Sequence, residues 1–279
     1  MAEFTQWTIA DAARHIAVPI DQDDKYSRGV LGVITGSVKY PGAAVIGVEA
    51  ALRTGVGMIR YLGPSMVGQL VLQRRPEAVY AAGGVQAWLI GSGMDPEETS
   101  ETTDAAVIAA MQQSVPIVLD GASVRRHAES AGPVVITPHV RELATLMDGD
   151  VEAIAADPAR AARDTADRLG VTVLLKGHST WVAAPDVLFR VGQAPTWLAT
   201  AGAGDALGGI LGALVATHAA EAMTETTQLA ELAATAALVH GLAAARASAG
   251  GPFTILDLCR AIPATVRDLL SYEPGLWTA

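Results

Sequence analysis

The sequence predicts an α/β fold in which a mostly parallel β-sheet carries helices on both faces. Short apolar runs alternate with helical stretches along the chain, an order typical of parallel sheets whose strands are joined by helices. Several of the apolar runs end in glycines or polar residues, as strands do beside a ligand-binding cleft. The chain has 279 residues, of which 51% are hydrophobic and 17% charged, and we expect a single domain over residues 1–279.

The apolar runs that we expect to be strands cover residues 29–35, 58–62, 87–90, 116–119, 134–136 and 171–175. Helical stretches lie between them over 43–54, 99–113 and 158–169, and a helical tail covers 228–249 and the residues after 254. A further strand over 181–184 follows 171–175 so closely that the two should form a hairpin. Pro263 should bend or end the last helix.

The carboxyl ends of the expected strands carry glycines and polar residues. In a parallel sheet these ends meet along one edge, and ligands bind there. One cleft should therefore collect Gly36, Gly91 to Gly93, Asp120, Thr137 to His139 and Lys176.

A glycine-rich segment, Thr200-Ala-Gly-Ala-Gly-Asp205, stands directly before an apolar helix. The free amides at the start of that helix, those of Gly202, Ala203 and Gly204, would form an anion hole suited to a phosphate. A carboxylate beside a bound phosphate is unfavourable unless it contacts the reacting group or a cation lies between them. Asp205 could therefore orient or deprotonate the hydroxyl that attacks in phosphoryl transfer. The alternative is an ordinary aspartate helix cap after a glycine turn.

A second helix start is predicted at Thr137, which can cap a helix, with Pro138 in the first helical position. His139 and Glu142 are three residues apart, so they share one face of that helix. The pair could bind a metal, hydrogen-bond a ligand, or be ordinary polar residues of a helix start. No third residue with a metal-ligand spacing accompanies them, so no metal site is assigned.

The turn of the expected hairpin reads Lys176-Gly-His-Ser-Thr180. A cation and hydroxyl groups at this turn could hold the phosphates of a nucleotide. A solvated hairpin tip would have the same composition.

Composition and missing motifs exclude several classes of protein. The net charge of −10 argues against a general nucleic-acid binder. No charge-free apolar run is long enough for a membrane span, and the polar N-terminus does not resemble a signal peptide, so we expect a cytoplasmic protein without membrane contacts. The single cysteine, Cys259, excludes an internal disulfide. The P-loop, Rossmann, esterase and zinc-protease motifs are absent.

Several motifs in order carry a family resemblance. They are Gly42-Ala43, Glu49-Ala-Ala-Leu-Arg-Thr-Gly-Val-Gly57, Ile90-Gly-Ser-Gly93, Val118-Leu-Asp120, Ile136-Thr-Pro-His139 with Glu142, Leu175-Lys-Gly-His-Ser-Thr180 and Ala203-Gly-Asp205. The chain resembles the ribokinase-like superfamily over roughly residues 29–270. Within it, the chain resembles the ADP/ATP-dependent NAD(P)H-hydrate dehydratases, whose domain is also the C-terminal half of bifunctional repair enzymes.

This resemblance implies a nucleotide-dependent repair of the S epimer of hydrated NADH or NADPH (NADHX or NADPHX). A nucleotide phosphorylates the ring hydroxyl, and loss of phosphate then restores NAD(P)H. Asp205 would be the catalytic group, and Mg²⁺ would accompany ADP or ATP. The hydrated dinucleotide would contact Ala43, Gly93, His139 and Asp205. The adenine nucleotide would contact Lys176, Gly177, His178, Ser179, Thr180 and Gly204.

The chain departs from the family pattern at three places. The family commonly has Gly-Pro-Gly-Leu-Gly where this chain has Gly91-Ser-Gly-Met-Asp95, and Leu-Asp-Ala-Asp-Ala-Leu where it has Leu119-Asp-Gly-Ala-Ser-Val124. Residues 197–201 also differ from the usual Asn-Pro-Gly-Met-Ala-Thr-Gly. The epimerase domain of the bifunctional forms does not precede Gly29, so we expect a separate epimerase chain. The alanine-rich helices could also bury the partner surface of a homo-oligomer, which we expect.

Two other functions share parts of this pattern. A small-molecule kinase of the same superfamily, acting for instance on a vitamin precursor alcohol, would use the same anion hole and Asp205 but release a phosphorylated product. A nucleotide-sensing or scaffold protein would keep the fold without turnover.

Overall fold

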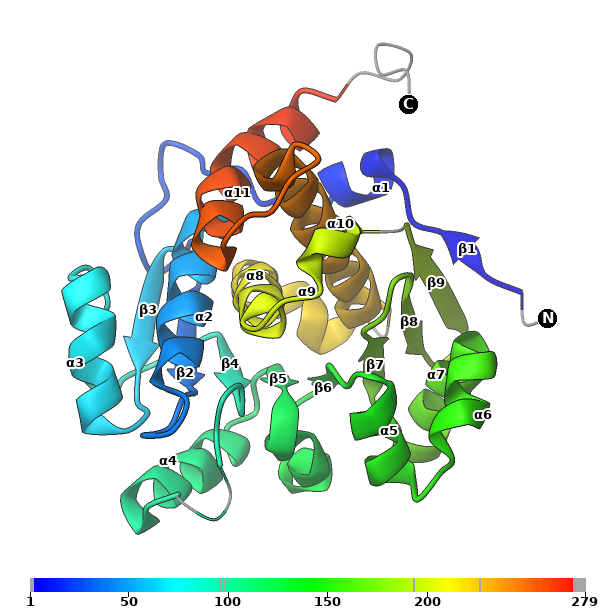
Figure 1. Cartoon of the computed structure of the whole chain (residues 1–279). Helices are drawn as coiled ribbons and strands as arrows, with labels where there is room; N and C mark the ends of the chain where they lie inside the picture. The colour runs from blue at the N-terminus through cyan, green and yellow to red at the C-terminus, as the bar shows by residue number, and fades with distance from the viewer. Residues whose placement is uncertain (1–2, 96, 98, 193, 226, 273–279) are drawn as a thin grey trace.

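The structure is a computed structural model that describes residues 3–95, 97, 99–192, 194–225 and 227–272. A nine-stranded sheet forms its centre, in the order β1-β9-β8-β7-β6-β5-β4-β2-β3 (Figure 1). The strands are β1 (Thr5–Gln6), β2 (Val30–Ile34), β3 (Met58–Tyr61), β4 (Ala87–Ile90), β5 (Ile117–Leu119), β6 (Val134–Ile136), β7 (Thr172–Leu175), β8 (Thr180–Ala184) and β9 (Val187–Val191). The neighbouring strands β7, β6, β5, β4, β2 and β3 pair in parallel, whereas β8 is antiparallel to both β7 and β9. The predicted sheet and hairpin are confirmed.

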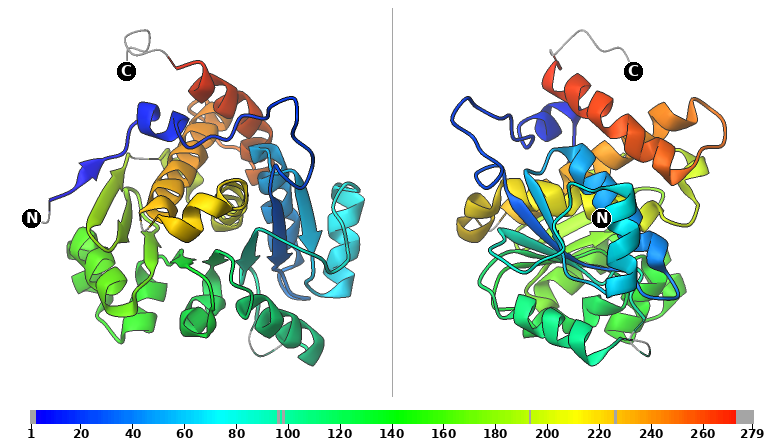
Figure 2. Two further views of the ribbon diagram at one scale, coloured as in Figure 1. Left: turned by 180° about the vertical axis from the view of Figure 1, so that it is seen from behind. Right: turned by 90° about the vertical axis from the view of Figure 1, so that its left-hand side faces the viewer.

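Helices cover both faces of the sheet, as predicted (Figures 1 and 2). One core contains residues of α1 (Ile9–Ala13), α2 (Pro41–Thr54), α3 (Ser65–Arg74), α8 (Ala203–Thr217), α9 (Ala219–Thr224), α10 (Gln228–Ser248) and α11 (Ile255–Leu270). The other contains residues of α4 (Glu101–Met111), the 3₁₀ helix η1 (Gly121–Glu129), α5 (Val140–Met147), α6 (Val151–Ala156) and α7 (Pro158–Leu169). Along β5, Val118 packs into the first core and Ile117 and Leu119 into the second, because successive strand residues point to opposite faces.

The central helix α8 is held tightly in place. Every residue from Ala206 to Ala216 is buried. Its contact with α2 is so close that a Cβ added to Gly209 would lie 2.2 Å from the carbonyl oxygen of Gly47. Only glycine permits this approach of two backbones. The packing fixes the N-terminus of α8 beside the edge where β4, β5 and β7 end.

The last helix does not end at Pro263, so one of the two expected effects of this proline is not observed. α11 continues through it to Leu270. Proline removes one helical hydrogen bond, but Ile262 and Leu269 are buried in the core beside α10 and hold both sides of the helix. Burial of the apolar face therefore outweighs the local cost of the proline.

One helix of the described chain, α10, is long and apolar enough to cross a membrane by length and composition. Its apolar window is 72% buried inside the fold. This burial is what a core helix of an α/β protein shows.

Candidate active site

Polar side chains from four strand ends meet in one hydrogen-bonded group. Ser92 follows β4, Asp120 follows β5, Thr137 follows β6 and Lys176 follows β7. Oδ1 of Asp120 accepts hydrogen bonds from Thr137 Oγ1 at 2.6 Å and from Lys176 Nζ at 2.8 Å. Oδ2 of Asp120 lies 2.9 Å from Ser92 Oγ. The strand ends therefore form the shared site that their polar residues predict.

Asp205 reaches this group from the first turn of α8. Its Oδ1 lies 2.8 Å from Ser92 Oγ. α8 has Gly202 as its N-cap residue and no side-chain cap hydrogen bond. The alternative interpretation of Asp205 as an ordinary helix cap is therefore wrong, and its side chain is directed to the site.

The N-terminus of α8 has unpaired backbone amides close to the ammonium group of Lys176. Gly202 has a left-handed backbone, with φ of 90°, and the amide of Ala203 forms a long hydrogen bond of 3.4 Å to the carbonyl of Thr200. The amides of Gly204 and Asp205 donate no hydrogen bond to any described residue. A Cβ added to Gly204 would lie 3.5 Å from Lys176 Nζ. Amides, helix dipole and ammonium thus converge, which favours an anion.

The charged groups of the site shift one another's protonation. Burial raises the pKa of Asp205 above its ordinary value, and the nearby charge of Asp120 adds to this effect. Burial also acts to raise the pKa of Asp120, but the Lys176 ammonium and three hydrogen bonds hold it below its ordinary value. Burial acts to lower the pKa of Lys176, yet Asp120 and Glu142 raise it. Lys176 and Asp120 are therefore both charged, and Asp205 is the carboxyl group poised to take up a proton.

His139, rather than Thr137, caps α5. The His139 ring nitrogen Nδ1 accepts from the amides of Arg141 and Glu142, both at 3.1 Å, and Glu142 Oε2 accepts from the His139 amide at 2.7 Å. Thr137 cannot cap the helix because its hydroxyl binds Asp120. The predicted positions of Thr137 and Pro138 are therefore wrong by two residues. Glu142 Oε2 also lies 3.7 Å from Lys176 Nζ, so the cap belongs to the site.

The possibility that His139 and Glu142 bind a metal gains no support from their surroundings. Their side chains are used in the capping box. No group of three potential ligands of the His, Cys, Asp or Glu type occurs among the residues that the structure describes.

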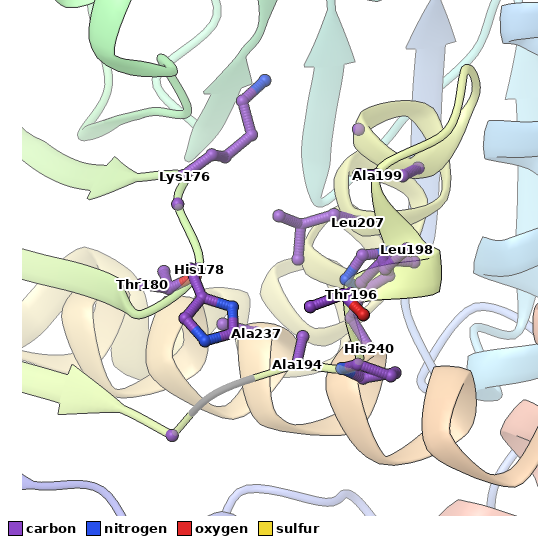
Figure 3. A pocket seen from close by; sticks show the side chains of 15 residues that line it. Lys176, His178, Thr180, Ala194, Thr196, Leu198, Ala199, Leu207, Ala237 and His240 are labelled. Carbon is purple, nitrogen blue, oxygen red and sulfur yellow. The ribbon is translucent and has the colours of Figure 1, made fainter. Parts of the chain in front are cut away.

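A cavity of about 340 Å³ lies between the hairpin turn and the start of α8. It is lined by Lys176, Gly177, His178, Thr180, Gly192, Ala194, Pro195, Thr196, Leu198, Ala199, Ala203, Gly204, Leu207, Ala237 and His240 (Figure 3). Most residues predicted to bind the nucleotide thus line one cavity. Ser179 does not line it, and its Oγ accepts a hydrogen bond from Arg190.

A second and larger cleft, of about 820 Å³, lies on the other side of the Lys176–Glu142 contact. Met94, His139, Arg141 and Glu142 are among its lining residues. Two residues predicted to bind the substrate, Ala43 and Gly93, touch each other, because a Cβ added to Gly93 would lie 2.3 Å from that of Ala43. Gly93 precedes Met94, which lines the cleft, so Gly93 and its neighbour Ala43 lie near the cleft.

Two polar residues of the site, Ser92 and His240, have no role predicted from the sequence, although Ser92 lies within the segment Gly91 to Gly93 that we expect in the cleft. His240 lies on α10, the residue is 7% exposed, and its Nε2 has no hydrogen-bond partner among the described residues. Burial lowers its pKa to about 4, so it is neutral at pH 7. A lone histidine in an alanine-rich helix was the available signal, whereas Ser92 stands where the family commonly has proline.

Comparisons with known proteins agree on one family. The family model described as NAD(P)H-hydrate dehydratase matches residues 31–263. The chain is 41% identical over 224 residues to the bifunctional NAD(P)H-hydrate repair enzyme Nnr of Mycobacterium tuberculosis, which covers 74% of this chain and 45% of that protein. The chain thus spans about half the length of these curated relatives. It is 31% identical over 242 residues to the ADP-dependent (S)-NAD(P)H-hydrate dehydratase of Neisseria meningitidis, covering 80% of this chain and 79% of that one.

Solved structures share the fold. The ADP/ATP-dependent NAD(P)H-hydrate dehydratase of Bacillus subtilis, co-crystallized with ATP and Mg²⁺, matches with a TM-score of 0.85 at 22% identity over 96% of this chain and all of that chain. A ribokinase-like superfamily protein of Enterococcus faecalis matches with a TM-score of 0.80 at 22% identity, covering 95% and 96% of the two chains. The ribokinase-like fold is confirmed. On the strength of the family model and the curated relatives, this chain belongs to the NAD(P)H-hydrate dehydratase family.

Proposed function

We propose that the protein is an ADP- or ATP-dependent dehydratase that converts the S epimer of hydrated NADH or NADPH to NAD(P)H. One observation carries the proposal. Lys176 and the free amide of Gly204 border the smaller cavity, and Glu142, 3.7 Å from Lys176, lines the larger cleft. Asp205 is joined to Lys176 through Ser92 and Asp120. A nucleotide in one and a hydroxyl-bearing substrate in the other would meet at this point.

The smaller cavity is the proposed nucleotide site. Its volume lies within the range of roughly 300 to 1,000 Å³ that is common for small-molecule pockets. Apolar residues such as Leu207 and Ala237 would pack against the base, and Lys176 with the amides of Gly204 and Asp205 would bind the phosphate that is transferred. The amides are fixed by a buried helix, so they need little reorganisation as charge develops.

The larger cleft is the proposed site of the hydrated dinucleotide. His139 lines it, and Ala43 and Gly93 pack together near it. Because Ala43 and Gly93 have little or no side chain, they would leave room for a flat ring to approach Asp205.

The chemistry follows from these positions. Asp205 takes the proton of the ring hydroxyl, the hydroxyl oxygen bonds to the terminal phosphorus of the nucleotide, and the shortened nucleotide leaves. Phosphate is then a good leaving group, so electron release from the ring nitrogen breaks the carbon–oxygen bond. Loss of a proton from the neighbouring ring carbon completes the dihydronicotinamide. The protein mainly positions the reactants and stabilises charge.

The residues present fit a magnesium ion that is bound mainly by phosphates and water. Mg²⁺ keeps several waters where it binds a nucleotide, so it needs few protein ligands. Asp120 is occupied by Lys176 and Thr137, and Asp205 is the base, so the phosphates and water would supply the ligands of the ion. When bound, the ion would neutralise charge on the phosphates.

The test follows the near-ultraviolet absorbance of dihydronicotinamide when the protein is mixed with hydrated NADH, Mg²⁺ and ADP or ATP. We expect recovery of absorbance that requires nucleotide and is lost in Asp205→Asn. A phosphorylated product without recovered absorbance would instead identify a kinase, and nucleotide binding without phosphate release would indicate a sensor.

A further inference from the structure

The hydroxyl of Ser92 stands between two carboxylates. Its Oγ lies 2.9 Å from Oδ2 of Asp120 and 2.8 Å from Oδ1 of Asp205, and the residue is 1% exposed. A serine hydroxyl donates one proton, whereas an ionised carboxylate only accepts. Both contacts can therefore be hydrogen bonds at the same time only if one of the two carboxyl groups carries a proton.

Asp205 is the group that can carry it. Asp120 also accepts hydrogen bonds from Thr137 and from the ammonium of Lys176, and both stabilise its ionised form. Asp205 has no side-chain hydrogen bond other than that with Ser92 among the residues that the structure describes. The arrangement thus fits a protonated Asp205 that donates to Ser92, which in turn donates to Asp120.

We propose that Ser92 is a positioning residue that accommodates the proton which Asp205 removes from the substrate hydroxyl. This inference rests on the proposed function. Before transfer both carboxylates are ionised, and Ser92 donates to Asp205 because Asp120 already has two other donors. After transfer a half-turn of the Asp205 carboxyl group places its new O–H against Ser92 Oγ, and the serine hydroxyl turns to Asp120. One proton moves from substrate oxygen to Asp205, and no other bond changes.

The exchange has a chemical consequence. The proton is directed away from the substrate, so it does not return to the oxygen that now attacks phosphorus. The ion pair of Lys176 and Asp120 provides a fixed negative charge on the far side of Ser92. The other charged group near Lys176 is Glu142, at 3.7 Å. These three groups and Asp205 are the ones whose charges set the proton's position.

The first measurement needs neither substrate nor nucleotide. Carboxyl ¹³C signals of the aspartates are titrated in the wild type, Ser92→Ala and Ser92→Thr, and the Asp205 signal is identified by its loss in Asp205→Asn. A Ser92 hydroxyl that bridges the two aspartates takes part in two hydrogen bonds when Asp205 is protonated and in one when Asp205 is ionised. Removal of its hydroxyl should therefore lower the pKa of Asp205, and threonine should restore it.

The opposite result has a clear meaning. A serine that only donates to ionised Asp205 lowers that pKa, so Ser92→Ala would then raise it. A rise, or no change, would overturn the proposal. Unchanged amide spectra and unfolding midpoints show that the variants are folded.

The second measurement is turnover. Ser92→Ala should lower kcat by about tenfold, the equivalent of one hydrogen bond, leave the KM for nucleotide unchanged, and recover in Ser92→Thr. Unchanged kcat would also overturn the proposal. A wild type without nucleotide-dependent recovery of NADH would refute the proposed function instead, and the titration would still decide how Ser92 is hydrogen-bonded.

Discussion

The ammonium of Lys176 lies 2.8 Å from Oδ1 of Asp120, and the aspartate side chain of this ion pair is only 8% exposed. The pair joins the end of β7 to the end of β5, with β6 between them. It therefore ties the nucleotide cavity to the centre of the sheet as well as supplying charge to the site.

Lys176→Met should destabilise the protein by about 3 kcal/mol, because it leaves Asp120 as a buried charge without its cation. The pair stabilises the fold between an acidic limit and an alkaline limit. Because the pKa of Asp120 is lowered, its stabilisation is complete above pH 3.8 and is lost on further acidification. Because the pKa of Lys176 is raised, its stabilisation is complete below pH 10.5 and is lost at more alkaline pH. Urea unfolding at several pH values measures both. Lys25→Met at an exposed position is the control, and equal effects of the two variants would contradict the expectation.

Glu49→Gln should also cost about 3 kcal/mol, because Glu49 is fully buried and binds Arg53, Arg74 and Arg75. Against the opposing effect of burial, these guanidinium groups lower the pKa of Glu49 to about 2 from 4.5. The stabilisation is complete above pH 4.5 and is lost as pH falls towards 2, so the variant should show a weaker acid dependence of unfolding. Glu77→Gln removes a half-exposed partner of Arg75 and should change little. A variant as stable as the wild type would exclude this role.

His240→Leu should separate binding from stability. The buried Nε2 has no hydrogen-bond partner by geometry in the described chain, and the Ala203 backbone acts only to raise the pKa of His240 against the effect of burial, so leucine should cost little stability. We expect the nucleotide to supply that partner, so its affinity should fall about tenfold on replacement, as measured by calorimetry. The lowered pKa also predicts that wild-type stability falls as pH drops from 6.5 to about 4, and that leucine removes this loss. Unchanged nucleotide affinity would place His240 in the packing alone.

Gly93→Ala should raise the KM for the hydrated dinucleotide and lower stability. Gly93 has a φ of 64°, and its new Cβ would lie 2.3 Å from the Cβ of Ala43. Gly42→Ala is the matched control, because no atom lies within 4 Å of its added Cβ at the start of α2. That variant should be neutral or more stable by about 0.5 kcal/mol. Steady-state kinetics and thermal unfolding of the pair test the contrast.

Local signals were sufficient for the parts of the fold that depend on local order. Alternating apolar runs and helical stretches predict the sheet and both helical layers, and the short turn after Lys176 predicts the hairpin of β7 and β8. Tertiary contacts decide the rest. Thr137 is a good cap by composition, but its hydroxyl is used by Asp120. Pro263 is a helix breaker in isolation, yet α11 is buried on both sides of it.

The site shows the same division. Strand ends identified Asp120 and Lys176, and the glycine-rich motif identified Asp205. Ser92 could not be assigned because its role depends on Asp120 and Asp205, which lie 28 and 113 residues away along the chain. His240 could not be assigned because its role depends on the absence of a hydrogen-bond partner for Nε2 in the described chain. No spacing along the chain reveals either relationship.

The unbroken burial of α8 from Ala206 to Ala216 predicts how the catalytic end behaves over time. The amides of Ala206 to Ala216 should exchange with deuterium only when the whole molecule unfolds, so Asp205 is attached to one of the slowest-opening elements of the fold. On the other side of the nucleotide cavity lies the hairpin turn that begins at Lys176 and leads into β8 at Thr180. Adjustment to different nucleotides should then occur on the hairpin side, while the acid–base end stays rigid through each turnover.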